Sequence, residues 1–130
     1  MIGYVTLGSN DLDRARGFYD QLMPVLGAGR ILEFGDAFTL YGTGMGKPGL
    51  AVCKPHDGNQ ASVGNGVMAA LVCDTRDRVD SLYGKAMELG GSDEGPPGVR
   101  GEEGDQAFYA AYFRDLDGNK LCAFRVGPNA

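Results

Sequence analysis

Short apolar runs alternate with amphipathic stretches along the chain. Residues 2–7 form an apolar, β-branched run that predicts a strand, and apolar residues at helical spacing follow it, beginning at Leu12. Asn10 or Asp11 is expected to cap this helix, Pro24 to bend or end it early, and Gly27 to stop it. Three more strands are predicted, at residues 30–34, 37–42 and 50–54. The first half of the chain therefore predicts the order β-α-β-β-β.

The same order begins again at Gly66. Residues 67–73 predict a strand, and a helix capped by Thr75 follows and stops at Gly90-Gly91. The segment 93–105 is rich in Gly, Pro and acidic residues, which predicts a long loop with at most a brief strand near Val99. A closing hairpin is expected from residues 106–114 and 120–126. The two copies begin about half a chain length apart, which favours a duplicated module.

This pattern predicts one domain made of two modules. Module one is assigned to residues 1–55, a linker without periodicity to 56–65, module two to 66–126 and a frayed tail to 127–130. A chain of 130 residues is long enough to bury one stable core without disulfides or metals.

Composition excludes several classes of partner. The net charge of −5, with no cluster of Lys or Arg, argues against nucleic acid or an anionic membrane as a partner. No apolar run approaches the length of a membrane span and no signal peptide is recognisable, so a cytoplasmic location is expected. The three cysteines are far apart in apolar runs, which predicts reduced core thiols rather than a disulfide or zinc framework.

Two end motifs carry a resemblance to a known superfamily. The first is the opening Tyr4-Val-Thr-Leu with Asp11-Leu-Asp-Arg-Ala and Phe18-Tyr19, and the second is the ending from Tyr109 through Asp117-Gly118 to Leu121. Together with the repeated β-α-β-β-β order, they resemble the vicinal oxygen chelate superfamily, which includes glyoxalase I, bleomycin-resistance proteins and extradiol dioxygenases. The resemblance covers nearly the whole chain.

The resemblance implies an α+β fold in which two tandem βαβββ modules form a half-open mixed β-barrel around a small-molecule cavity. It also implies a homodimer that often completes this cavity across its interface. In the enzymes of the superfamily, His or Glu side chains from both modules hold a divalent metal that stabilises an oxyanion of the substrate or intermediate.

The metal-ligand positions carried over from the superfamily hold other residue types here. The strand-one His falls on Tyr4, the second-module His on Met68 and the terminal Glu on Cys122, while the strand-four position falls on Leu50 or Val52. None of these is a His or a carboxylate, so we expect neither a metal nor another cofactor. A soft Cu(I) site at Met68 and Cys122 is the disfavoured alternative, because both residues are also ordinary filler of apolar cavities.

Alternation along the predicted strands gives the residues expected to line the cavity. They are Tyr4, Thr6, Met68, Ala70, Cys122 and Phe124, with Tyr41, Tyr109 and Tyr112 as candidates whose facing the sequence leaves open. Tyr4 offers a hydrogen-bonding group on an apolar wall, although a core tyrosine bonded to backbone is an equal alternative. His56, the only histidine, lies in a loop after the fourth strand, where a general base or a solvent-exposed side chain is expected.

Three functions remain open from the sequence. The leading hypothesis is a metal-independent, small-molecule-binding protein. The second is a glyoxalase-like lyase or isomerase that uses His56, Tyr4 or Cys122 in place of the metal. The third is a structural or regulatory dimer whose cavity has collapsed.

Overall fold

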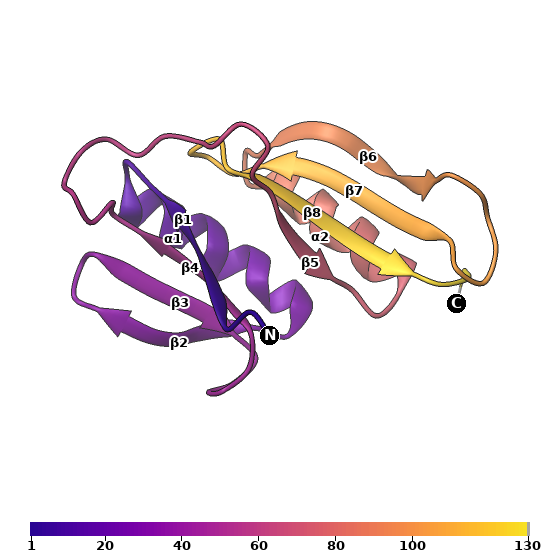
Figure 1. Ribbon diagram of the computed structural model, residues 1–130, viewed down its shortest axis with the longest axis horizontal. Helices are drawn as coiled ribbons and strands as arrows, with labels where there is room; N and C mark the ends of the chain where they lie inside the picture. The colour runs from indigo at the N-terminus through magenta and orange to yellow at the C-terminus, as the bar shows by residue number, and fades with distance from the viewer. Residues whose placement is uncertain (130) are drawn as a thin grey trace. The chain divides into compact units, whose positions relative to one another are not determined.

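The computed structural model of the protein describes residues 1–129, and the chain divides into two compact units. The first is Met1–Gly66 and the second begins at Val67 (Figure 1). Residues 56–65, expected to be a linker, belong to the first unit. We call the two units module one and module two.

Module one contains one four-stranded sheet and one α-helix. Its elements are β1 (Tyr4–Gly8), α1 (Leu12–Leu22), the 3-10 helix η1 (Met23–Leu26), β2 (Gly29–Phe34), β3 (Phe38–Gly42) and β4 (Gly49–Cys53). The strand order is β1-β4-β3-β2, with β1 parallel to β4 and the other pairs antiparallel. The single parallel pair includes β1, the strand that precedes the helix, as expected for a chain that crosses over through a helix.

Local chemistry sets the limits of α1. The Asp11 side chain accepts a hydrogen bond from the backbone N–H of Arg14 at 3.1 Å and so caps the helix. The α-helix ends before Pro24, which lies in η1, and Gly27 stops the segment with φ of 71°. The predicted cap, interruption and stop are therefore confirmed.

A buried tyrosine joins the sheet of module one to its helix. The Tyr41 hydroxyl donates to Asp20 Oδ1 at 2.8 Å, and Arg30 donates to both oxygens of the same carboxylate, each at 2.8 Å. The hydrogen bond from Arg30 holds the pKa of Asp20 below its usual range, while burial and then the Asp20 hydrogen bond raise the pKa of Tyr41. A neutral phenol, a carboxylate and a guanidinium therefore form one satisfied network across β2, β3 and α1.

Module two repeats the arrangement. Its elements are β5 (Ala69–Val72), α2 (Arg76–Glu88), β6 (Ser92–Arg100), β7 (Phe108–Arg114) and β8 (Lys120–Val126). The strand order is β5-β8-β7-β6, and only β5 and β8 are parallel. Thr75 caps α2 by accepting from the N–H of Arg78 at 3.1 Å. The α+β class and the two βαβββ modules are thus confirmed.

The prediction of a long loop at residues 93–105 was wrong for residues 93–100, which belong to a strand, whereas residues 101–105 lie outside the strands. Strand β6 covers Ser92–Arg100 and pairs with β7, with register shifts between Asp93 and Gly95 and between Gly95 and Gly98. Pro96 and Pro97 lie between Gly95 and Gly98, inside the second register shift, where the ladder with β7 is interrupted, and β6 is an edge strand, where proline is tolerated.

The expectation of a frayed tail was wrong at its first residue. The N–H of Gly127 donates to the Ala107 carbonyl at 2.9 Å, and the Gly127 carbonyl accepts from Arg76 at 3.1 Å. Ala130 lies outside the described residues.

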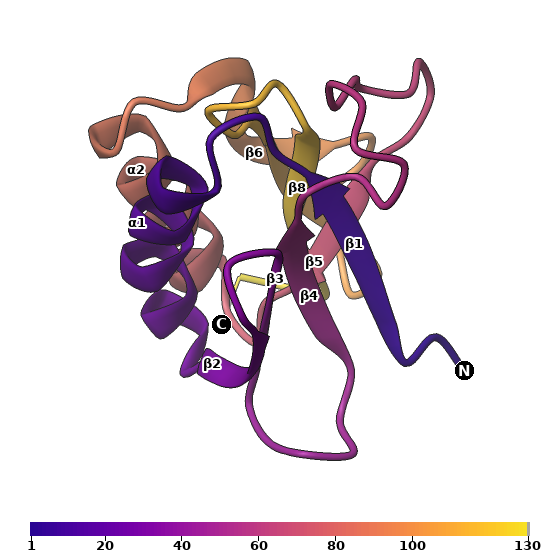
Figure 2. The ribbon, with the colours of Figure 1, turned by 90° about the vertical axis from the view of Figure 1, so that its left-hand side faces the viewer.

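Each helix covers one face of its own sheet. In module one, α1 lies along one side of the strands, and no helix of the module covers the other side (Figure 2). In module two, α2 contacts β6, β7 and β8. We call the uncovered side of each sheet its open face. Across residues 1–129, no helix is long and apolar enough to cross a membrane.

The Tyr41 network predicts that the same substitution has different effects on the two faces of the module-one sheet. Tyr41→Phe removes a hydrogen bond to a charged group and should lower the free energy of unfolding by about 1.5–3 kcal/mol. Tyr4→Phe is the matched control, because Tyr4 is 57% exposed, and it should change stability by less than about 0.5 kcal/mol. Urea unfolding of the three proteins measures both changes, and equal effects would show that the Tyr41 contact contributes nothing particular.

Candidate functional site

The contacts of α1 establish which side chains of β3 face the helix. Arg16 Nε donates to Thr39 Oγ1 at 2.7 Å, and the Tyr41 hydroxyl reaches Asp20, so Thr39 and Tyr41 lie on the helix side. Because side chains alternate along a strand, Phe38 and Leu40 lie on the open face.

Strand pairing extends this assignment across the sheet. Leu40 lies opposite Ala51, and Ala51 lies opposite Thr6, so all three share the open face. The open face of module one is therefore formed by Tyr4, Thr6, Leu32, Phe34, Phe38, Leu40, Ala51 and Cys53. Aromatic rings meet on it: the Phe38 ring lies 6.2 Å from Tyr4 and 5.6 Å from Phe34, between ring centroids.

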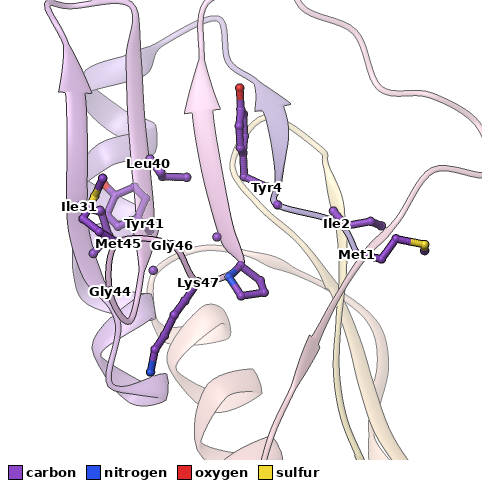
Figure 3. Close-up of a pocket in the computed structure, with 14 residues that line it drawn as sticks. Met1, Ile2, Tyr4, Ile31, Leu40, Tyr41, Gly44, Met45, Gly46 and Lys47 are labelled. Carbon is purple, nitrogen blue, oxygen red and sulfur yellow. The ribbon is translucent and has the colours of Figure 1, made fainter.

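One end of this face borders a cavity of about 430 Å³ (Figure 3). Residues 1–4, Leu40 and the loop 44–49 line it. In Figure 3 the Leu40 side chain points toward β4 and Tyr4, and the Tyr41 ring turns the other way. Although Tyr41 borders the cavity, the residue is completely buried, with 0% exposure.

The other end borders a broader, open hollow of about 1080 Å³. Thr6, Phe38 and Cys53 line it from the sheet, and residues 54–62, which include His56, line it from the loop. Two hydrogen bonds hold this loop to the start of the helix segment: Asn10 Nδ2 donates to the Ala61 carbonyl at 3.1 Å, and the Ala61 N–H donates to Asn10 Oδ1 at 2.6 Å. The structure therefore brings His56 to the same hollow as Thr6.

The open face of module two follows from the same reasoning. The Tyr109 hydroxyl donates to Asp80 of α2 at 2.7 Å, so Tyr109 lies on the helix side. Tyr112 and Ala70 both lie opposite Cys122 in the register, and they share the other side with it. This open face includes Ala70, Val72, Phe108, Ala110, Tyr112, Lys120, Cys122 and Phe124, and Arg100 shares it because it lies opposite Phe108.

The predicted site residues therefore separate by face. Tyr4 and Thr6 lie together on the open face of module one, and Ala70, Cys122 and Phe124 lie together on that of module two. Met68 directly precedes β5 and is 41% exposed. Of the three tyrosines left open, Tyr112 joins an open face, whereas Tyr41 and Tyr109 point to their helices and do not line it.

The sequence-based prediction of the site did not include several open-face residues. Phe38 and Leu40 were overlooked because nothing in the strand itself says which alternate set faces the helix. Tyr41 was the available signal. It packs beside Tyr19 of α1 with ring centroids 6.0 Å apart, so Leu40 and Phe38, at odd spacings from it, point to the other side of the strand. Arg100 was missed because its strand was predicted to be a loop.

The residues that the resemblance aligns with the superfamily's metal ligands form a poor ligand set for a hard divalent ion. They supply a phenol at Tyr4, a thioether at Met68 and the thiol of Cys122, whose pKa burial raises. Leu50 and Val52 were the wrong choice for strand four, since they lie opposite Tyr41 and Thr39 on the helix side. The open-face residues there are Ala51 and Cys53. In the described part of the chain, no group of three His, Cys, Asp or Glu side chains is placed to hold a metal.

Comparisons with known proteins bear on this geometry. Residues 1–123 match the family model described as the Glyoxalase/Bleomycin resistance protein/Dioxygenase superfamily. No curated protein matches the sequence.

Solved structures have the same fold. A glyoxalase/bleomycin resistance protein from Albidiferax ferrireducens T118 is 31% identical, with a TM-score of 0.84 over 96% of this chain and 98% of that one. A glyoxalase/bleomycin resistance protein/dioxygenase family enzyme from Burkholderia phytofirmans PsJN is 20% identical, with a TM-score of 0.69 over 95% and 97%. A lactoylglutathione lyase from Agrobacterium tumefaciens, also 20% identical, has a TM-score of 0.65 over 96% and 92%.

The three thiols should differ sharply in reactivity. Cys53 is half-buried on the open face of module one, whereas Cys73 and Cys122 are 4% and 1% exposed. We expect a disulfide reagent to label Cys53 at least about tenfold faster than the other two, since access and thiolate content control the rate. Burial raises the pKa of Cys53, so its rate should still increase with pH above 9.

The control for this labelling is Cys53→Ser, which should remove the fast phase and leave the two slow ones. A fast phase that survives in Cys53→Ser would contradict the assignment of Cys53 to an accessible face.

Proposed function

The chain belongs to the glyoxalase, bleomycin resistance protein and dioxygenase superfamily, and on this basis we propose that it binds a small, partly apolar molecule without a metal ion. The observation that carries the proposal is the composition of the two open faces. They are formed by aromatic rings, aliphatic groups and, in module one, the half-buried thiol of Cys53, with few hydrogen-bonding groups among them. Ligand pockets typically have this composition, an apolar lining with a few polar groups that fix orientation.

The hollows of module one support this proposal. A volume of about 430 Å³ lies within the usual range for small-molecule sites, and the broader hollow adds the polar groups of Thr6 and His56. Space of this size favours a binding protein over a structural dimer with a collapsed cavity.

A metal-independent lyase or isomerase is the second candidate, and the position of His56 favours it. His56 lines the same hollow as Thr6 and Cys53, where an imidazole is able to accept a proton from a bound molecule. A catalyst would lose activity in His56→Gln and retain ligand affinity, whereas a binding protein would have no turnover to lose.

We also propose that the protein is a cytoplasmic homodimer. Large apolar side chains are exposed on the single chain, including Phe34 at 62% and Val72 at 70%, and such groups often mark an interface. Three free cysteines agree with a reducing compartment. Light scattering after gel filtration should give twice the mass of one chain, and a monomer at micromolar concentration would exclude the dimer.

The binding function is tested with phenylnaphthylamine, a neutral aromatic probe that fluoresces in apolar surroundings. The wild-type protein should bind it saturably, and Phe38→Ala should weaken the affinity by about three- to tenfold, because an aromatic contact is lost. Val63→Ala is the control: it shortens an exposed apolar side chain of the same module outside both hollows and should leave the affinity unchanged. Absence of saturable binding would contradict the proposed binding function.

Metal independence has its own measurement. Protein purified without chelator should contain far less than one equivalent of manganese, iron, nickel or zinc by elemental mass spectrometry, and EDTA should leave its melting temperature unchanged. A resident metal stabilises by mass action, by about 2.7 kcal/mol at a hundredfold excess over its dissociation constant. One equivalent per chain that is lost in Cys122→Ala would overturn the metal-free assignment.

A further inference from the structure

The open face of module two carries a tyrosine flanked by two cations. The guanidinium carbon of Arg100 and the ammonium nitrogen of Lys120 each lie 5.5 Å from the centroid of the Tyr112 ring. These distances lie within the range of a cation–π contact, and the three residues come from three different strands. Two positive charges therefore meet on one half-buried patch of a chain whose net charge is −5.

The irregular part of β6 holds Arg100 in place. Its two terminal nitrogens donate to the carbonyls of Gly98 and Pro96, both at 2.8 Å. Gly95 and Gly98 leave room for the guanidinium, because a Cβ at either position would lie 3.1 or 3.2 Å from its nitrogens. The side chain is thus ordered before any ligand arrives, which lowers the entropic cost of binding.

Acidic groups do not neutralise this pair. Glu94, the carboxylate on the same strand nearest to Arg100 along the chain, is bound by Arg114 at 2.6 Å. Among residues 1–129, no carboxylate forms an ion pair with Arg100 or Lys120. Burial raises the pKa values of Tyr112 and Cys122, and their side chains hydrogen-bond to each other, so both are neutral at pH 7. The patch therefore keeps two positive charges.

The aromatic side chains of Phe108 and Phe124 lie on the same face as the two cations. The Phe108 and Phe124 rings stack with centroids 5.7 Å apart, and Ala110 and Phe124 lie one step along the strands from Tyr112 and Cys122 on the same face. A ligand that reaches both features needs an anionic end and an apolar body.

We infer that the open face of module two binds an organic acid, with Arg100 and Lys120 contacting its oxyanion and the Phe108–Phe124 pair its apolar part. The inference rests on the proposed binding function and narrows it to one class of ligand. Arg100 retains N–H groups for the oxyanion beyond the two that bond to backbone, because a guanidinium has five donors.

Two fluorescent probes separate the contribution of an anionic group to binding affinity from that of the apolar skeleton. Anilinonaphthalene sulfonate has the skeleton of phenylnaphthylamine with one added anionic group. The wild-type protein should bind the sulfonate at least about fivefold more tightly than the neutral probe, and salt should reduce this preference by screening. Arg100→Gln and Lys120→Gln should each lower the affinity for the sulfonate by about three- to tenfold and leave the affinity for the neutral probe unchanged.

Arg78→Gln and Lys85→Gln are the matched controls. They remove the same charges from α2, on the other side of the sheet, and should leave the preference for the sulfonate intact. If Arg100→Gln fails to fold, Lys120→Gln carries the test alone.

The outcomes distinguish the two proposals. Failure of both probes to bind would reject the binding function itself. Equal affinity for both probes, or a preference that survives both Gln substitutions, would reject the organic-acid site and leave the binding function standing. Naphthoate should displace the bound sulfonate at concentrations at least about tenfold below those of inorganic phosphate; equal displacement would reject an organic acid in favour of a free oxyanion.

Discussion

Each sheet of this protein has a single helix to cover it, and a single helix covers a single face. The rest of the structure depends on this constraint. In module one, α1 buries the side chains of one face, among them Tyr41 and Val52, while Tyr4 and Phe34 on the opposite face remain more than half exposed. The same condition holds in module two, because the order of elements and the order of strands are repeated there. Duplication of a half-covered sheet gives the chain two faces that are available for a ligand or a partner.

Hydrogen bonds between sheet and helix determine which side chains lie on these faces. Tyr41 bonds to Asp20 in module one, and Tyr109 bonds to Asp80 in module two. A shift of one residue would move every side chain of the strand to the other side, so a hydrogen bond from the strand to the helix restricts the register. The tyrosines thus contribute to the candidate site indirectly, by turning Phe38, Leu40 and Tyr112 toward the open faces.

The two open faces have diverged in chemistry although the modules share a plan. Module one offers aromatic rings, Thr6 and an accessible thiol, and it borders hollows that also include His56. Module two offers a cationic and aromatic patch built on an edge strand with two register shifts. In the described part of the chain, no group of three His, Cys, Asp or Glu side chains is placed to hold a metal ion on either face. An apolar surface with two localised charges suits recognition of a molecule more than stabilisation of a metal-bound oxyanion.

The sequence by itself determined the helices, every strand except β6, and their order, because hydrophobic periodicity, the caps at Asp11 and Thr75, and the stop at Gly27 are local signals. It also determined the family, through motifs at both ends of the chain. It did not determine the facing of Tyr41 and Tyr109, the pairing of β6 or the place of Arg100. These depend on contacts between residues far apart in the chain: a hydrogen bond from strand to helix fixes a side chain's direction, and pairing with β7 orders a Gly- and Pro-rich segment that has no strand propensity of its own. Only the tertiary structure decides such properties, because the energy that fixes them comes from the neighbouring strand or helix and not from the segment itself.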